Sequence, residues 1–363
     1  MLDKFLIRHK DDIWNLRALY LKGENHLALS ELEEAVEIFS NLLPRYPQLK
    51  DYTQLKLAEI YLTSEEEEKA FEQLSNLLQE FPNSRLIPNG KFLLGKLFFN
   101  RGDLDHALKI FGEYTKKYPK KDLVPESMFF IGTILEKQSK TIQAYETYAK
   151  IFHSFPLNDF AIKAEGKIEE IKRRKIKLPE FSQKLVSKRI KLLMKGGKYS
   201  TVIVECNKYL KRYSQGPMFQ KLTFNLAGVY LSLKKRDEAL EIFQSFLKKY
   251  PSSSYAPEAL YGIANIFWNQ GKLPKAIEYS NKTTNQYPFS RYAEKSYFML
   301  SRIFGQKKRH EKAISILELM LKKFPRGDYA PNGYWRIGWT NYLLGNYQKA
   351  AEIFSKAASR FSD

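Results

Sequence analysis

Residues 334–354 read YWRIGWTNYLLGNYQKAAEIF, and this stretch decides the fold. Two runs of apolar residues at helical spacing flank Gly345, which predicts two amphipathic helices joined by a tight turn. A small residue, Gly338, lies twelve positions before Ala350, and a large one, Phe354, lies four positions after it. Because residues i and i+4 share a helix face, we expect Ala350 and Phe354 to pack on the first helix, where a small residue allows close approach.

The same arrangement recurs upstream, so the chain is built from repeats. Its alanine positions are Ala35, Ala70, Ala107, Ala144, Ala239, Ala276, Ala313 and Ala350. Prolines follow the first seven alanines after twelve residues: Pro47, Pro82, Pro119, Pro156, Pro251, Pro288 and Pro325. Since proline cannot continue a helix, the second helix of each repeat is predicted to end just before it.

An alanine, a large apolar residue four positions later and a following proline make the tetratricopeptide pattern, lengthened here from about 34 residues to about 37. The register breaks once, because Ala144 and its next equivalent, Val202, are 58 residues apart. The sequence therefore predicts an all-α, right-handed solenoid of about nine helix hairpins, with a register break near 157–182. We expect segments 1–178 and 179–363, with an extra helix over 157–175 in the first.

The balance of charged residues changes near the register break. Residues 1–180 hold 28 Lys and Arg and 28 Asp and Glu, whereas residues 181–363 hold 32 basic and 12 acidic residues. The whole net charge of +20 therefore belongs to the second half. Such a field favours an anionic partner, which could be an acidic protein, an acidic glycan, lipid head groups or nucleic acid.

Several kinds of chemistry have little support in the sequence. The five histidines are scattered and Cys206 is the single cysteine, so we expect no metal site, no cofactor and no catalytic residue. The apolar run within residues 1–8 is too short for a signal peptide. No apolar stretch approaches the roughly 18–20 residues of a transmembrane helix.

The chain resembles the N-terminal superhelical region of the soluble lytic (murein) transglycosylases. Three stretches carry the resemblance: LLPRYPQLKDYTQLKLAEIYL at 42–62, FPLNDFAIKAEGKIEEI at 155–171, and the terminal stretch quoted above. Envelope tetratricopeptide proteins share the style of the repeat at 250–279. The resemblance implies a scaffold for peptidoglycan cleavage whose catalytic domain lies beyond residue 363. The open last repeat fits a chain cut before such a domain.

One position of the first helices is aromatic in six repeats: Phe92, Phe129, Phe224, Tyr261, Phe298 and Trp335. These residues either pack between helices or form a partly exposed aromatic ladder for a peptide or a sugar. The position four residues on is more polar and is expected to line a groove. The candidate partner-binding residues are Tyr261, Asn265, Trp268, Phe298, Arg302, Trp335 and Trp339.

Three functions remain open from the sequence. The first is the scaffold of a periplasmic lytic transglycosylase, with peptidoglycan glycan as its ligand. The second is a stand-alone envelope adaptor that binds an acidic or extended peptide of a protein partner. Nucleic-acid binding is the third; it rests on net charge alone, and we do not expect it. A periplasmic or envelope location is predicted, with the cytoplasm as the alternative.

Overall fold

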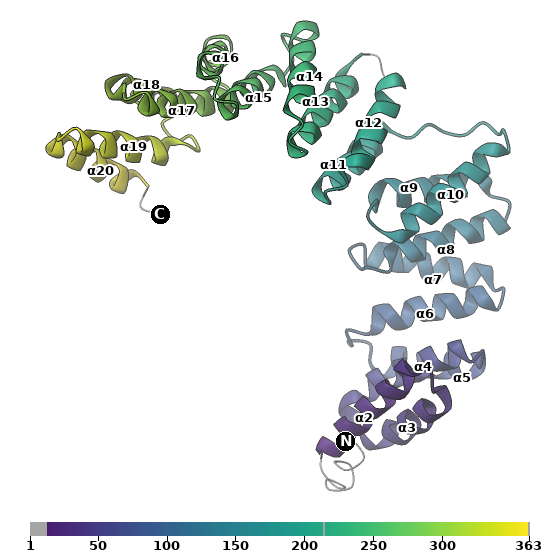
Figure 1. The fold of residues 1–363 in the computed structure, drawn as a ribbon. Helices are drawn as coiled ribbons and strands as arrows, with labels where there is room; N and C mark the ends of the chain where they lie inside the picture. Colours follow the sequence, from purple (N-terminus) through teal and green to yellow (C-terminus); the bar gives the residue numbers. More distant parts are fainter. Residues whose placement is uncertain (1–12, 213–214, 362–363) are drawn as a thin grey trace. The chain divides into compact units, whose positions relative to one another are not determined.

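The computed structural model describes residues 13–212 and 215–361, and regular structure in these residues is helical throughout (Figure 1). The short apolar run within residues 1–8 lies outside the described residues. The chain divides into two compact units, residues 1–192 and 193–363, with the division inside one helix. The segment boundary expected at residue 178 stays a proposal.

Unit 1 begins with four consecutive helix hairpins. Their helices are α2 (Ile13–Ala28), α3 (Leu32–Arg45), α4 (Lys50–Thr63), α5 (Glu67–Glu80), α6 (Ile87–Asn100), α7 (Leu104–Lys117), α8 (Val124–Lys137) and α9 (Thr141–Ser154), with a short 3-10 turn, η1 (Pro47–Leu49), before α4. An additional helix, α10 (Asp159–Arg173), packs on α9 and α8. The helix α11 (Gln183–Lys195) contains the boundary between the units.

Unit 2 continues the pattern of hairpins. Its helices are α12 (Tyr199–Arg212), α13 (Pro217–Ser232), α14 (Arg236–Lys249), α15 (Ala256–Asn269), α16 (Leu273–Gln286), α17 (Arg291–Gln306), α18 (His310–Lys323), α19 (Ala330–Leu343) and α20 (Tyr347–Arg360). Each helix contacts the next one along the chain from α12 to α20. In the described residues the predicted fold class is confirmed: an all-α tetratricopeptide solenoid of nine hairpins, broken once around α10.

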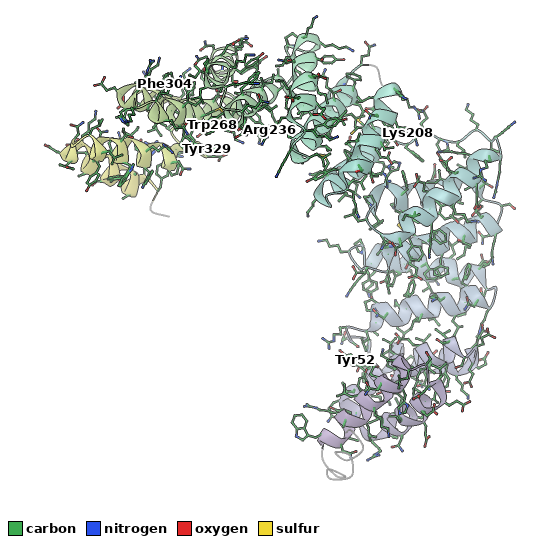
Figure 2. The ribbon with its side chains drawn as sticks, in the orientation of Figure 1. Tyr52, Lys208, Arg236, Trp268, Phe304 and Tyr329 are labelled. Carbon is green, nitrogen blue, oxygen red and sulfur yellow. The ribbon has the colours of Figure 1, made fainter. Side chains whose placement is uncertain are left out.

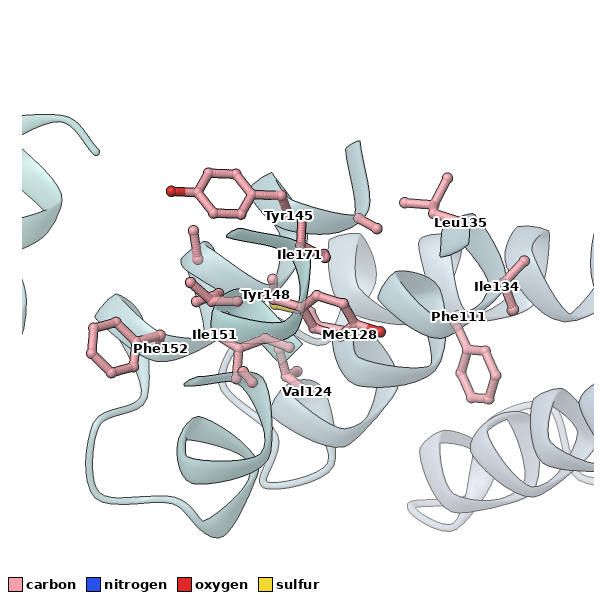
Figure 3. Packing of buried hydrophobic residues seen from close by; sticks show 14 of the residues in the cluster. Phe111, Val124, Met128, Ile134, Leu135, Tyr145, Tyr148, Ile151, Phe152 and Ile171 are labelled. Carbon is pink, nitrogen blue, oxygen red and sulfur yellow. The ribbon is translucent and has the colours of Figure 1, made fainter. Parts of the chain in front are cut away.

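The register break is a packed joint. Residues 176–182 have no regular structure, and Phe181 stacks on Tyr145 of α9 with ring centroids 5.4 Å apart. Leu178 also packs on the core of this part of unit 1. Figure 3 shows that core, in which Tyr148, Ile151 and Ile171 come from α9 and α10. The extra helix therefore extends the apolar core beyond the fourth hairpin.

The turn between the two helices of a hairpin has one conformation in all nine repeats. A residue with positive φ stands five positions before the alanine register: Ser30, Glu65, Gly102, Ser139, Gly197, Lys234, Gly271, Lys308 and Gly345. Glycine adopts this left-handed conformation without steric cost, whereas a side chain costs roughly 1–2 kcal/mol there. Five repeats therefore carry local strain that the other four avoid.

Replacing Lys308 by glycine is expected to stabilise the protein by about 1 kcal/mol, because φ at this residue is +56°. The matched control is Lys307→Gly one position earlier, where φ is −80° and glycine only adds unfolded-chain entropy. Urea unfolding midpoints measure both changes. A loss of stability for Lys308→Gly equal to that of the control would contradict the turn conformation.

A close contact between glycine and an aromatic ring sets the separation of the two helices in four hairpins. A Cβ atom added to Gly95 would lie 2.8 Å from Cε1 of Phe111 in the partner helix. The same relation joins Gly23 to Phe39, Gly132 to Tyr148 and Gly338 to Phe354. Where the first helix has alanine, as at Ala58, the facing residue is the smaller Leu74. Residue size is thus complementary in these hairpins, as dense packing requires, whereas the hairpin of α13 and α14 combines Ala227 with Phe243.

The variant Gly95→Ala is expected to lose about 2 kcal/mol of unfolding free energy, because its methyl group overlaps the Phe111 ring. Adding Phe111→Leu recreates the Ala58–Leu74 pair, so the double variant should lose less than the sum of the single losses. As a control, Gly112→Ala lies within α7 with no atom within 4 Å of the new Cβ. That control should gain about 1 kcal/mol from helix propensity. Additive losses at Gly95 and Phe111 would refute size matching.

Candidate partner-binding face of unit 2

The candidate residues lie on three successive first helices of unit 2. Tyr261, Asn265 and Trp268 belong to α15, Phe298 and Arg302 to α17, and Trp335 and Trp339 to α19. Positions i, i+4 and i+7 of a helix share one face, so each helix presents its candidates to the same side. We call these seven residues the first-helix face. α15 also contacts α17 directly, which joins their parts of the face.

Arg302 connects α15 with α17. Its guanidinium carbon lies 4.4 Å from the centre of the Trp268 ring, within the range of a cation–π interaction (Figure 2 labels Trp268). Burial raises the pKa of the Tyr261 hydroxyl, and the nearby charge of Arg302 opposes that shift. The structure therefore brings Tyr261, Trp268 and Arg302 together. Asn265, which lies between Tyr261 and Trp268 on α15, is half-buried. Its side-chain oxygen accepts a hydrogen bond from Asn269 at 3.4 Å.

The inner members of the aromatic column pack between repeats. A tyrosine at or just before the start of the next first helix covers each one: Tyr255 on Phe224 at 5.1 Å, Tyr292 on Tyr261 at 5.9 Å, and Tyr329 on Phe298 at 4.9 Å between ring centroids. These pairs leave Phe224, Tyr261 and Phe298 half-buried. In unit 1, Phe92 of the same column is buried in the core. The packing interpretation therefore accounts for much of the column.

The aromatic residues of α19 are more open. The Trp335 and Trp339 rings stack with centroids 5.8 Å apart and planes 10° from parallel, and Tyr342 stacks on Trp339 at 5.5 Å. Trp335 is 53% exposed and Trp339 is 43% exposed. Single exposed apolar residues are common, but a stacked row of three large rings on one helix is a feature of binding surfaces. Trp335 and Trp339 are thus the exposed part of the first-helix face, and Tyr342 continues their stack.

Positive charge dominates the four first helices of unit 2. Helices α13, α15, α17 and α19 carry Lys221, Arg291, Lys295, Arg302 and Arg336 but only two carboxylates, Glu258 and Glu294. Glu258 interacts with Tyr292 and Arg291. Glu294 is 3% exposed and accepts the Tyr329 N–H at 2.8 Å, so it holds the turn of the next repeat. Neither acid neutralises Arg302 or Arg336.

Burial raises the pKa of Glu294 above its usual range. Between the ordinary and the raised pKa the folded state binds more protons than the unfolded state, so stability from this group is lost as pH rises. Glu294→Gln removes the titration and keeps an acceptor for the Tyr329 N–H. We expect the unfolding free energy of the wild type relative to this variant to fall as the pH rises above the ordinary pKa of a glutamate, about 4.3. A difference that rises over this range would contradict the assignment.

Sequence reasoning missed two sets of residues that contact the aromatic column of the first helices. The covering tyrosines, Tyr255, Tyr292 and Tyr329, recur at intervals of 37 residues and each precedes an alanine, so their period was a usable signal. Arg336 lies one position off the aromatic column and gave no periodic signal. Its guanidinium carbon lies 5.5 Å from the centre of the Phe298 ring.

The described residues also bear on metal binding, thiol chemistry and membrane insertion. Within residues 13–212 and 215–361, no three His, Cys, Asp or Glu side chains are grouped as metal ligands would be. Cys206 is buried in α12, where burial and then the charge of Glu205 raise its thiol pKa to about 12. A search of the described helices for a segment long and apolar enough to cross a membrane found none.

Comparisons with known proteins agree with the repeat architecture. A family model described as YfiO, outer membrane lipoprotein, matches residues 15–215, which is more than half of the chain. Tetratricopeptide repeat models match residues 224–291, 294–322 and 333–363. The chain is thus a tetratricopeptide scaffold for protein–protein interaction. The first-helix face lies beyond the YfiO match and within the three repeat matches.

Similar solved structures are also helical repeat proteins. A tetratricopeptide repeat protein from Parabacteroides merdae is 17% identical, with a TM-score of 0.37 over 75% of this chain and 92% of its own. The TPR domain of P58(IPK) is 16% identical, with a TM-score of 0.29 over 96% of this chain and 93% of its own. MamA from Desulfovibrio magneticus is 15% identical, with a TM-score of 0.39 over 49% of this chain and 93% of its own. None of the curated proteins matches the chain.

Proposed function

This chain belongs to the YfiO family of outer membrane lipoproteins, and we propose that it is an envelope adaptor that binds an extended, acidic segment of a protein partner. The binding site is the first-helix face of unit 2. The observation that carries the proposal is the row of half-buried and exposed aromatic side chains that crosses α15, α17 and α19. Repeat proteins use such surfaces, formed by successive repeats, to bind partners.

The dimensions and chemistry of the face favour a peptide chain. Aromatic side chains on three successive helices can contact an extended segment at several points, as in other peptide-recognition grooves. Exposed Trp335 and Trp339 offer large, rigid contact area, which is typical of residues that dominate binding energy. Lys295 lies over Tyr261 and Arg302 lies over Trp268, and these positive charges favour an acidic segment.

The description of the family as outer membrane lipoproteins supports an envelope location. The cytoplasm is the alternative location. Fractionation of cells that express the natural gene at its own level distinguishes the two, because the proposal requires the protein in the envelope fraction.

A second candidate is the scaffold of a lytic transglycosylase that binds peptidoglycan. The observation in its favour is the same row of aromatic rings, because sugars also stack on exposed tryptophan. The resemblance of the sequence to the superhelical region of those enzymes adds to it. In that case purified cell-wall sacculi would sediment the protein, and Trp335 would be needed for the effect.

The two candidates are separated by a peptide selection. A random peptide library displayed on phage is selected against the full chain, and affinities of the selected peptides are measured by fluorescence anisotropy. The proposal predicts acidic peptides whose affinity falls about tenfold in Trp335→Ala and in Trp339→Ala, because each loses a large contact. The matched control is Phe289→Ala, since Phe289 is an exposed aromatic residue in a turn outside the face.

Selected peptides that bind the control and the tryptophan variants equally would place the site elsewhere. Failure to select any peptide, together with Trp335-dependent sedimentation by sacculi, would replace the adaptor with the peptidoglycan scaffold.

A further inference from the structure

Arg336 lies beside Arg302 of the first-helix face, and neither guanidinium group has a carboxylate partner among the residues that the structure describes. Arg302 is stacked on Trp268, and Arg336 lies over Phe298, so each has an aromatic ring beneath it. Both residues are half-buried. Burial, and then the positive charge of Arg302, lower the pKa of Arg336. Phe298 and Arg302 stand four residues apart on one face of α17, so Arg336, which lies over the Phe298 ring, places its positive charge next to that of Arg302.

This arrangement is costly for the free protein. A charge that is partly removed from water is disfavoured unless an opposite charge or hydrogen bonds compensate it. Among the residues that the structure describes, no ion pair neutralises Arg302 or Arg336, although other arginines such as Arg101 have carboxylate partners at 2.8–3.0 Å. Arg302 and Arg336 thus differ from the paired arginines of unit 1.

The carboxylates that could neutralise the pair are bound to other groups. Glu294 accepts the backbone N–H of Tyr329, and a Cβ on Gly327 would overlap its Oε1 atom, so the turn encloses this carboxylate. Glu258 interacts with Tyr292. Unit 2 as a whole contains 28 Lys and Arg against 12 Asp and Glu, so free acids are scarce around this surface.

We propose that Arg302 and Arg336 together bind one carboxylate side chain of the partner segment, while an apolar residue of the same segment packs on Trp335 and Trp339. The proposal rests on the adaptor function above and names its recognition element. A guanidinium presents a planar pair of N–H donors that matches a carboxylate, and the aromatic rings beneath hold the two planes in place. A carboxylate between them also relieves their mutual repulsion.

The probe is a capped decapeptide of alternating glutamate and phenylalanine, and its counterpart has glutamine in place of glutamate. Binding of each to the full chain is measured by fluorescence anisotropy at about 150 mM salt, which screens the general positive field of unit 2. The proposal predicts that the glutamate peptide binds at least about tenfold more tightly than the glutamine peptide.

Variants of Arg302 and Arg336 test whether these two residues cause the difference in affinity between the glutamate and glutamine peptides. Arg302→Gln and Arg336→Gln are each expected to weaken the glutamate peptide by about tenfold while leaving the glutamine peptide unchanged. Arg336→Lys keeps the charge but loses the planar pair of donors, so we expect an intermediate affinity. The control, Arg309→Gln, removes an equal charge from an exposed position in the turn between α17 and α18. It should leave both affinities within about twofold.

Thermal unfolding distinguishes a binding role of Arg336 from a structural one. If the pair exists to bind a carboxylate, Arg336→Gln removes a partly buried, uncompensated charge and leaves the melting temperature unchanged or higher. A purely structural arginine would lower the melting temperature on replacement. A fall in melting temperature of Arg336→Gln with no change in peptide affinity would overturn the proposal.

The remaining outcomes are also decisive. Equal binding of both peptides, with losses in Trp335→Ala, would refute the arginine site and leave the adaptor function standing. Binding of neither peptide would overturn the arginine site, and the phage selection above would then decide the adaptor function independently. Arg336-dependent binding of a single-stranded oligonucleotide, without binding of the glutamate peptide, would assign the site to another class of polyanion.

Discussion

The fold depends on one contact, the approach of a small residue in the first helix to a large residue in the second. At Gly95 and Phe111 there is no space for even one added methyl group. This contact fixes the separation of the two helices, and the repeated hairpin then places equivalent residues on the same side of successive repeats. The ordered first-helix face of unit 2 is a consequence of that spacing.

The same regularity explains how the face acquires its charge. Within a solenoid each repeat is stabilised by contacts with its neighbours, so polar residues on the open side of a first helix are little constrained by the core. Glu294 is an exception, because it is buried and binds the turn of the next repeat. Because that carboxylate binds the turn of the next repeat, Arg302 and Arg336 have no acidic partner in the part of the chain that the structure describes. The electrostatics of the face therefore follow from the way in which adjacent repeats are joined.

Most of the fold could be predicted from the sequence because the determinants are periodic. The alanines, prolines and turn glycines located the hairpins, and the irregular spacing before Val202 located the break. Other features had no such signal. Glu65 and Lys308 adopt the turn conformation because the hairpin imposes it, although neither residue type favours it. Arg336 belongs to no repeated column, and only the three-dimensional structure places it over Phe298 beside Arg302. Exposure likewise depends on neighbours, which is why Phe298 is covered while Trp335 is open.

The protein joins a repeat scaffold of the YfiO family to a cationic and aromatic surface outside the matched region. We propose that a partner segment lies along α15, α17 and α19. A crystal structure of the full chain with a phage-selected acidic peptide would show where the segment binds. We expect an extended peptide on these first helices, with one carboxylate within hydrogen-bond distance of both Arg302 and Arg336. A peptide bound to the second helices α14, α16 and α18, or to the basic turns, would contradict this proposal.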